Sequence, residues 1–416
     1  MNKLKIIVID REFCRYVKNE SNHRIINALK KITEIEDLWI LLDSKSIRSK
    51  NERILDFNFK MISDYKTNNV EDILKIENPD VILISNDYDM EIRSFIPVAK
   101  KMKIPIILML HNTFFEGHLD KMTSALIQNR LTINKNRKKE IIEKIFFMLH
   151  NYKKSGYNIF QLANIGIKEV VNWFRYYQKS LMGNFGANLI LVSGRSWHDE
   201  LTKRELKSKI VITGNPIMDK FYEKIRYIQK IEKEENEIEI IFVTTSVVEH
   251  GGWTNNEWEQ TVIQTIQELM KCSDKIKIKL KIHPTSEKKE KYERILKDMG
   301  VNIPIYQSEN FIEVIQNADL IITFAHTTAI IEAIMLKKPI ITINLFEYPK
   351  KNMPLVDQKI SEEVKNIEKL NEVIFNQLKK KNSPEIDEFL EKIFYKIDGN
   401  SANRVAQAIL QEINND

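Results

Sequence analysis

Short apolar runs alternate with longer segments of helical periodicity over most of the 416 residues. Most of these runs are too apolar for strands with one wet face, and they are typical of parallel strands buried on both faces. The pattern therefore predicts repeated strand–helix units. The predicted strands cover 3–9, 38–43, 81–87, 104–111, 187–194, 209–216, 237–246, 276–284, 301–307, 319–324 and 339–344.

The alternation occurs in two stretches, which predicts two doubly wound α/β domains facing a cleft. The first covers 1–218 with a basic helical insertion at about 112–187, and the second covers 237–385. The charged segment 219–236 is the predicted linker, and 386–416 forms C-terminal helices that could pack back on the first domain. No GxGxxG follows the first strand, so a standard dinucleotide-binding fingerprint is absent.

Composition favours a reduced, cytoplasmic protein. Cys14 and Cys272 have neither metal nor disulfide spacing. The start, MNKLKIIVID, is a strand without an apolar segment and cleavage site, so we expect no signal peptide. No run reaches the roughly 18 apolar residues of a membrane-spanning helix. The net charge is +6, and 120–179 alone holds 12 basic and 4 acidic residues.

The basic segment, at about 120–180, also contains the aromatic residues Trp173, Phe174, Tyr176 and Tyr177. It could lie on an anionic membrane surface, or it could form a solvated helical hairpin with an aromatic core. Because the basic excess is so local, the membrane interpretation is favoured, which would make the protein peripheral at the inner face of the cell membrane. No nucleic-acid-binding module pattern occurs, so nucleic acid is not an expected partner.

Polar residues gather where the predicted strands end. Ligands bind outside the carboxyl ends of parallel strands, so these positions are candidates for a site. Two of them suit a phosphate, His283-Pro284 and His326-Thr327-Thr328. The others are Asp10 to Glu12, Asn86-Asp87, His111 to Thr113, Gly214 to Pro216 and Thr244 to Ser246.

Thr327 and Thr328 open a predicted helix that carries Glu332. Their hydroxyls, the free N–H groups of the first turn and the helix dipole favour a phosphate. Glu332 lies four residues after Thr328, on the same face of the helix, where it could accept hydrogen bonds from a ribose. The alternative is an ordinary helix N-cap with an acid nearby.

Two histidines at strand ends could take part in catalysis. His283, held by Pro284, could donate to a phosphate oxygen and offset charge on a leaving group, although a lone histidine is more often structural. His111 or Glu116 could act as a general base, and a hydrogen-bonded loop histidine is the alternative for His111. HEXXH is absent, and we expect no metal site.

Four segments of the sequence resemble motifs of a known group of proteins. They are VITGNPIMD (211–219), KIHPTSEKKEKYERIL (281–296), ADLIITFAHTTAIIEAIMLKKPIITIN (318–344) and DGNSANRVAQAI (398–409). With them, the second half resembles the C-terminal domain of GT-B glycosyltransferases. It is most similar to the group of CDP-glycerol glycerophosphotransferases, capsule polysaccharide transferases and UDP-N-acetylglucosamine 2-epimerases. The resemblance implies a GT-B-like fold with two Rossmann-like domains.

The resemblance also implies roles for residues of this chain. His283, Thr327 and Thr328 would contact the phosphates of the donor, and Glu332 would contact its ribose. LMLHNT (108–113) resembles the WHGT stretch of the glycerophosphotransferases, which suggests His111 as the base. The chain departs from that pattern twice. Asn112 replaces the glycine, and His326-Thr327-Thr328 replaces the usual serine and adds an imidazole near the phosphates.

The hypothesis that follows is an inverting, metal-independent transferase without a cofactor. It would move a glycosyl or polyol-phosphate group from a nucleotide-activated donor to a surface-glycan or lipid-linked acceptor. The first alternative is a non-hydrolysing sugar-nucleotide 2-epimerase, which the weak match of HNTFFEGHL (111–119) to the epimerase stretch HVEAGLR disfavours. The second is a non-catalytic nucleotide-sugar-binding protein, since fold does not fix function.

Overall fold

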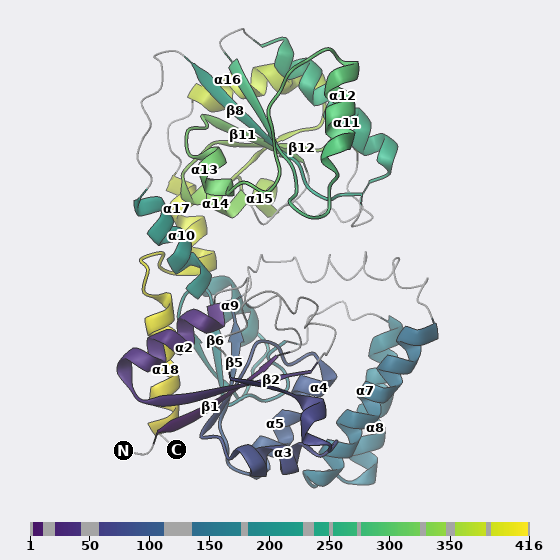
Figure 1. Cartoon of the computed structure of the whole chain (residues 1–416), viewed down its shortest axis with the longest axis vertical. Coiled ribbons are helices and arrows are strands. Elements are labelled where there is room, and N and C mark those ends of the chain that lie inside the picture. The colour runs from purple at the N-terminus through teal and green to yellow at the C-terminus, as the bar shows by residue number, and fades with distance from the viewer. Residues whose placement is uncertain are drawn as a thin grey trace. The chain divides into compact units, whose positions relative to one another are not determined.

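The structure of the protein is a computed structural model. In it the chain divides into two compact units (Figure 1). The first unit is Met1–Tyr222 with Glu391–Asp416, and the second unit is Glu223–Leu390. The structure describes residues 3–10, 21–42, 58–111, 135–175, 182–227, 237–248, 253–272, 276–324, 330–346, 354–379 and 384–414.

The first unit contains, within those residues, a seven-stranded parallel sheet in the order β3-β2-β1-β4-β5-β6-β7. β1 lies inside the sheet, with Ile7 opposite Leu38 on one side and Ile82 on the other. The strands are β1 Leu4–Asp10, β2 Ile35–Leu41, β3 Phe59–Met61, β4 Val81–Ile84, β5 Ile106–Leu110, β6 Leu189–Val192 and β7 Lys209–Ile212.

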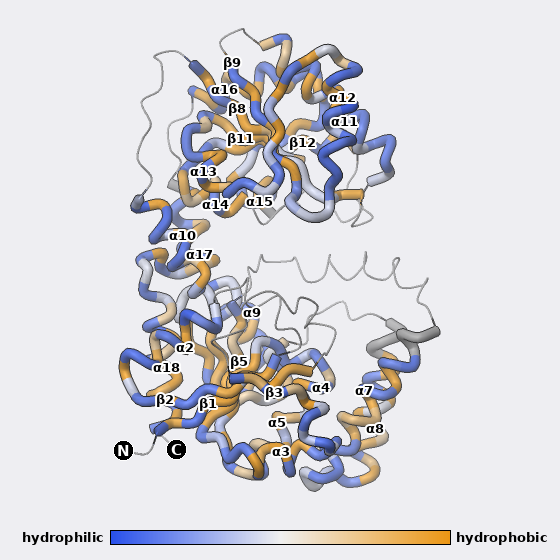
Figure 2. The backbone as a smooth tube through the Cα atoms, viewed as in Figure 1, coloured by the Kyte–Doolittle hydropathy of each residue, from blue (hydrophilic) through white to orange (hydrophobic). Residues whose placement is uncertain are grey.

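Helices cover both faces of this sheet. Ile7 and Ile9 of β1 pack in one apolar cluster with α3 and α5, whereas Ile6 and Val8 pack in another with α2 and α18. Both faces are therefore covered, which explains why the strands do not alternate, and Figure 2 shows the middle of the sheet as mostly hydrophobic. The helices are α2 Ser21–Ile32, η2 Ile62–Tyr65, α3 Val70–Glu77, α4 Met90–Arg93, α5 Phe95–Lys101, α7 Lys135–Lys154, α8 Ile159–Arg175, α9 Arg195–Thr202, α10 Pro216–Arg226 and α18 Ser401–Asn414.

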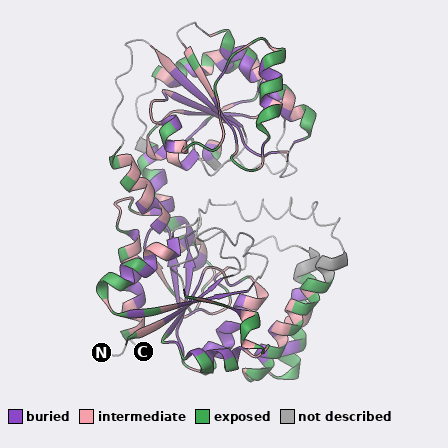
Figure 3. Ribbon diagram, viewed as in Figure 1, coloured by how far each residue is buried: buried purple, intermediate pink, exposed green. Residues whose placement is uncertain are grey.

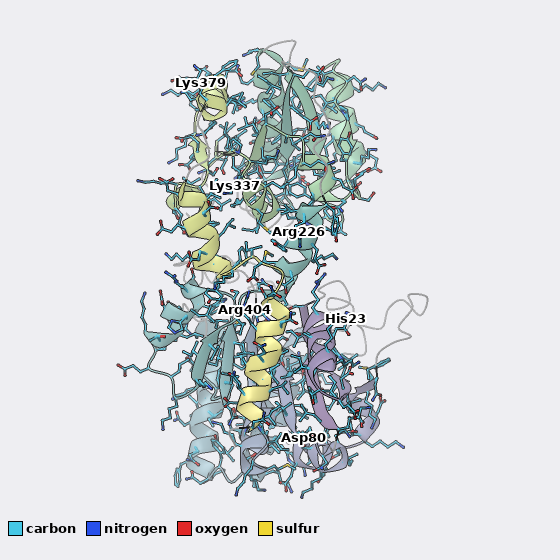
Figure 4. All side chains as sticks on the ribbon, turned by 90° about the vertical axis from the view of Figure 1, so that its left-hand side faces the viewer. His23, Asp80, Arg226, Lys337, Lys379 and Arg404 are labelled. Carbon is cyan, nitrogen blue, oxygen red and sulfur yellow. The ribbon has the colours of Figure 1, made fainter. Side chains whose placement is uncertain are left out.

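The end of the chain returns to the first unit through α18. The Asp219 carboxylate accepts hydrogen bonds from the N–H groups of Ser401 (3.0 Å) and Ala402 (2.8 Å), and so caps this helix. Arg404, labelled on α18 in Figure 4, donates from Nε to the carbonyl of Thr213 (2.8 Å). Asp219, the first residue of the predicted linker, is 2% exposed and belongs to the core of this unit.

The described part of the predicted helical insertion, 135–175, is a hairpin of α7 and α8 that is anchored on the first unit. Arg93 is 2% exposed and pairs with Glu169 of α8 at 3.0 Å, while its guanidinium lies 4.1 Å from the centre of the Phe185 ring. On α7, the Asn151 side chain accepts from the N–H of Val70 at 2.8 Å. The hairpin is therefore fixed by buried polar contacts as well as by packing.

The second unit holds, in its described part, a six-stranded parallel sheet in the order β10-β9-β8-β11-β12-β13. The strand order reverses between β8 and β11, as in doubly wound nucleotide-binding domains. The strands are β8 Ile238–Val243, β9 Ile276–Lys281, β10 Ile305–Tyr306, β11 Leu320–Phe324, β12 Ile340–Ile343 and β13 Glu362–Val364.

Three helices of the second unit, α11, α12 and α16, pack on its sheet in one apolar cluster. Phe242 of β8 and Phe324 of β11 meet in this cluster at 5.7 Å between ring centres, and Tyr292 contributes from α12. The helices are α11 Asn255–Met270, α12 Lys289–Asp298, α13 Phe311–Ile315, α14 Ile330–Met335, α15 Pro354–Asp357, η3 Ile367–Lys369, α16 Leu370–Lys379 and α17 Pro384–Phe394.

Two short strands differ from the sequence prediction. The predicted strands of the second domain end at Asn344, but β13 follows and pairs in parallel with β12, with Ile341 opposite Glu362. In the first unit, β3 extends the sheet beside β2. Each of these strands has three residues, which is too short to show a hydrophobic period, so pairing with a longer neighbour decides their conformation. The doubly wound α/β class itself is confirmed.

Candidate nucleotide-sugar site

Polar residues follow β8 and β9 at the carboxyl edge of the second sheet. β8 continues into Thr244, Thr245 and Ser246, which are 3%, 6% and 1% exposed. β9 continues into the half-buried His283. Because β8 and β11 are the pair at which the strand order reverses, a ligand of this unit is expected beside them.

His283 has a defined tautomer in its neutral form. Its Nδ1 accepts hydrogen bonds from the backbone N–H groups of Thr285 (3.3 Å) and Ser286 (3.1 Å), so Nδ1 carries a lone pair. The proton of the neutral ring is then on Nε2, which is left as a donor. A donor at this position suits an anionic group such as a phosphate.

A buried carboxylate, that of Glu287, holds the His283 turn. Its Oε2 accepts from the N–H of His283 (2.6 Å) and from Oγ1 of Thr244 (2.7 Å), and its Oε1 accepts from the hydroxyl of Tyr292 (2.5 Å). Tyr292 in turn accepts from Nε1 of Trp258 at 3.2 Å. Burial, reinforced by Glu287, raises the pKa of Tyr292 well above its ordinary value, so the phenol stays a donor.

This Glu287 network was not predicted from the sequence. Glu287 is 7% exposed, although it belongs to a segment of mostly exposed lysines and glutamates. The three hydrogen bonds that it accepts offset the cost of removing a carboxylate from water. The network joins the ends of β8 and β9 to α11 and α12, and therefore fixes where the His283 ring lies.

Lys281 is a second residue that the sequence did not reveal. It ends β9, is 5% exposed, and donates from Nζ to the carbonyls of Gln307 (2.7 Å) and Ile282 (3.2 Å). Burial lowers its pKa, while the carboxylates of Glu309, Glu287 and Glu332 act in the opposite direction. Glu332, half-buried in the first turn of α14, thus lies in the electrostatic neighbourhood of the same strand end.

Several predicted site residues fall outside the described part of the chain. These are Glu116, His326, Thr327 and Thr328. The description of α14 begins at Ile330. The predicted roles of these four residues stay predictions, whereas the described residues His283 and Glu332 are brought to one region by β9 and α14.

His111, the predicted base, is buried at the end of β5. It is 7% exposed, and its Nε2 has no hydrogen-bond partner within the described residues. Its carbonyl accepts from Nδ2 of Asn215 at 2.5 Å, which ties β5 to the start of α10. Burial lowers the pKa of His111 to about 3, so the imidazole is neutral at pH 7 and holds an added proton weakly.

Two acidic strand ends of the first unit have structural partners. Asp10, 1% exposed, accepts from Oγ of Ser85 at 3.0 Å. Asp87 is fully buried and accepts from the N–H of Gly183 (3.0 Å) and of Phe185 (3.4 Å), which holds the return from the helical insertion. Burial raises the pKa of Asp87 to about 6 against these bonds.

Neither a metal cluster nor a membrane span occurs in the described ranges. No group of three or more His, Cys, Asp or Glu side chains there could hold a metal ion. None of the helices described combines the length and the apolar character that crossing a bilayer would need.

The two doubly wound units define the fold as GT-B, and solved structures share it. The UDP-GlcNAc 2-epimerase from Methanocaldococcus jannaschii is 18% identical, with a TM-score of 0.57 over 99% of this chain and 100% of that one. A structure of the same protein with UDP-GlcNAc and UDP gives 0.51 at the same identity and coverage. The glycotransferase of kitacinnamycin is 12% identical, with a TM-score of 0.55 over 99% and 100% of the two chains. At these identities the likeness shows the fold alone.

The family follows from the sequence. The model of the UDP-N-acetylglucosamine 2-epimerase family matches residues 186–410, which is more than half of the chain, and the chain belongs to this family. No curated protein matches the sequence significantly. The resemblance inferred from the sequence motifs is thus confirmed, and the chain is placed among enzymes that use nucleotide sugars.

Proposed function

We propose that the protein is an inverting, metal-independent transferase. It moves a glycosyl or polyol-phosphate group from a nucleotide-activated donor to a surface-glycan or lipid-linked acceptor. The donor binds the second unit, and the observation that carries this assignment is the His283 turn beside the strand-order reversal, whose backbone N–H donates to Glu287 and whose ring Nδ1 accepts from Thr285 and Ser286. A UDP-GlcNAc complex of a protein with the same fold supports a nucleotide sugar as the donor.

The second unit supplies the groups that would bind the donor and stabilise its departure. The His283 Nε2–H donates to a phosphate oxygen, joined by Thr327 and Thr328, with His326 as a second imidazole nearby. Glu332 accepts from the ribose hydroxyls. When a glycosyl group is transferred, the bond between the sugar carbon and the phosphate oxygen breaks, and these donors face the negative charge that develops on the nucleotide.

The acceptor oxygen forms its bond to the same carbon from the opposite side, and its proton passes to a base. The proposed base is His111 or Glu116. Since burial lowers the pKa of His111 to about 3, the imidazole at pH 7 is in the neutral form that can accept a proton, but its basicity is low. The low basicity favours Glu116 for the proton, with His111 as a neutral hydrogen-bonding partner.

A sugar-nucleotide 2-epimerase is the second candidate, because the family model carries that description. It would use the same donor residues without an acceptor. The sequence HNTFFEGHL (111–119) shares only the leading histidine and a later Glu-Gly with the HVEAGLR stretch, which favours the transferase. Incubation of the protein with UDP-GlcNAc alone separates the two, because only the epimerase would form an epimer without an acceptor.

The donor assignment is tested by thermal shift with UDP, CDP, CMP, GDP and UDP-GlcNAc. A ligand that binds only the folded state stabilises it, by about 2.7 kcal/mol at 100 times Kd. We expect one nucleotide to stabilise the wild type and to have little effect on Glu332→Ala or His283→Ala. Glu290→Ala is the matched control, because Glu290 is an exposed acid in the first turn of α12.

If no nucleotide stabilises the wild type, the donor assignment is wrong, and a non-catalytic role on the same scaffold takes its place. If the control variant loses the response as fully as Glu332→Ala, the acid of α14 has no specific part in binding.

A further inference from the structure

The helix α8 is apolar on two opposite sides. Its inner side packs through Leu162, Ile165 and Glu169 against α7 and the first unit. Its outer side carries Phe160, Ile167 and further apolar residues at spacings of seven and four, which lie on one helical face. The exposed apolar residues of α8 are Ile159 (71%), Phe160 (83%), Ile167 (64%), Val170 (42%) and Val171 (38%). We call this set the α8 outer face.

A helix on the surface of a soluble domain normally turns charged residues outward. The α8 outer face does the reverse, and Figure 3 shows exposed stretches along α7 and α8 on the surface of the first unit. The exposure is not a consequence of a detached helix, because Glu169 pairs with the buried Arg93 at 3.0 Å on the opposite side of α8. The fold therefore keeps the apolar side chains of the α8 outer face exposed to solvent.

The described charges of α8 itself are basic on the outside. Its one described acid, Glu169, is 9% exposed and paired with Arg93, and the exposed acids of the hairpin, Glu140 and Glu143, lie on α7. Lys153 and Lys154 are exposed at the tip of the hairpin, close to the start of α8, and Lys168 is exposed beside Ile167. A second copy of the protein placed on the α8 outer face would bring the lysines of the two copies together. An anionic surface would instead be attracted by these lysines.

We infer that the α8 outer face docks on an anionic membrane surface. The apolar side chains enter the boundary between headgroups and acyl chains, and the lysines contact the lipid phosphates. With 17 residues, and Lys168 and Glu169 in its middle, α8 lies on the membrane and does not cross it. The inference extends the proposed function, since a lipid-linked acceptor would be held in the same plane.

The test is flotation of the full chain with phosphatidylcholine vesicles, with and without phosphatidylglycerol. We expect binding to the anionic vesicles, weakened by salt. The double variant Phe160→Ser with Ile167→Ser should bind about tenfold or more weakly, as should Lys153→Gln with Lys154→Gln. The matched control is Ile76→Ser on α3, since Ile76 is 61% exposed on another surface of the first unit.

Circular dichroism checks the fold of each variant, and light scattering measures its oligomeric state. The inference is overturned if the wild type floats with neither vesicle, or if the α8 variants float as well as the wild type. It is also overturned if the α8 variants convert a dimer into monomers without changing flotation, which would make the face an interface between copies. Flotation needs no nucleotide, so it can succeed or fail separately from the donor assignment.

Discussion

At the residue scale, the Glu287 carboxylate decides the geometry of the candidate donor site. It accepts from the His283 backbone, Thr244 and Tyr292 within one buried network. All three partners donate to it, two of them to Oε2 and one to Oε1, so both oxygens of the side chain are used as acceptors. His283 is the residue that would touch the donor, and Glu287 positions it.

Replacing Glu287 by glutamine should disturb this network without changing its volume. With its NH₂ group at the Oε2 position the amide faces the N–H of His283, and with NH₂ at the Oε1 position the Tyr292 hydroxyl loses the acceptor of its proton. We expect the free energy of unfolding of the second unit to fall by about 1–3 kcal/mol. Denaturant titration measures the loss, and nucleotide thermal shift should weaken with it.

Glu293→Gln serves as the control for that variant. Glu293 lies on the same helix, α12, but its side chain is 55% exposed. An equal loss of stability in the two variants would mean that the buried hydrogen bonds of Glu287 contribute nothing beyond those of a surface acid.

At the element scale, the helical hairpin depends on where β4 ends. Asp87, just after β4, accepts from the N–H of Gly183 and of Phe185, which bring the chain back from the insertion. Arg93 of α4 then holds α8 through Glu169. Two buried charged residues within seven positions thus attach α7 and α8 to the sheet, which is why the α8 outer face keeps its orientation.

The attachment by Asp87 should depend on pH. Burial raises its pKa to about 6, above the ordinary 3.8, so between these values the folded chain keeps a proton that the unfolded chain releases. Its contribution to stability is present at low pH and is lost as the pH rises through this interval. Relative to Asp87→Asn, the wild type should lose about 2 kcal/mol from pH 4 to pH 6.

Denaturation curves at several pH values measure this difference. The exposed Asp199→Asn should show no comparable trend, since the Asp199 side chain is 61% exposed. A wild type that gains stability over the interval relative to Asp87→Asn would contradict the assigned direction.

The long elements could be predicted from the sequence because burial on both sheet faces leaves an unmistakable apolar run, as in β1 and β11. The residues that organise the site could not be predicted from the sequence. Lys277, Lys279 and Lys281 alternate along β9 as in a half-exposed strand, yet they are exposed, half-buried and buried in turn. Only the end of β9 is covered by other elements. The local pattern of residues does not indicate which of the three lysines is covered.

The same limit applies to the site residues. His283 was found because a proline follows it at a strand end, which is a local signal. Glu287 and Tyr292 belong to a charged helical segment, where one buried acid among exposed ones leaves the period unchanged. Their function depends on Thr244 and Trp258, which are more than thirty residues away in sequence.

At the scale of the whole molecule, the two units have separate apolar cores. Ile7 and Ile6 belong to clusters of the first unit, and Phe242 belongs to a cluster of the second. The first unit needs both ends of the chain, because α18 packs beside α2 and is capped by Asp219. A change at this cap should therefore affect one unit only.

Replacing Asp219 by alanine leaves the first two N–H groups of α18 without their acceptor. We expect the unfolding transition of the first unit to lose about 1–2 kcal/mol, while that of the second unit stays in place. Calorimetry with and without the stabilising nucleotide assigns the two transitions, since the proposed donor site belongs to the second unit. If both transitions moved together, the chain would unfold as a single cooperative body.

The placement of α18 also sets an order of events during translation. The ribosome releases the strands of the first unit early and the whole of the second unit next, but α18 begins only at Ser401. Until then, Ile25, Leu29 and their neighbours lack the helix that covers them. The second unit can mature on the nascent chain while the first waits for the last residues, so a prematurely terminated product would present this uncovered surface to chaperones and proteases.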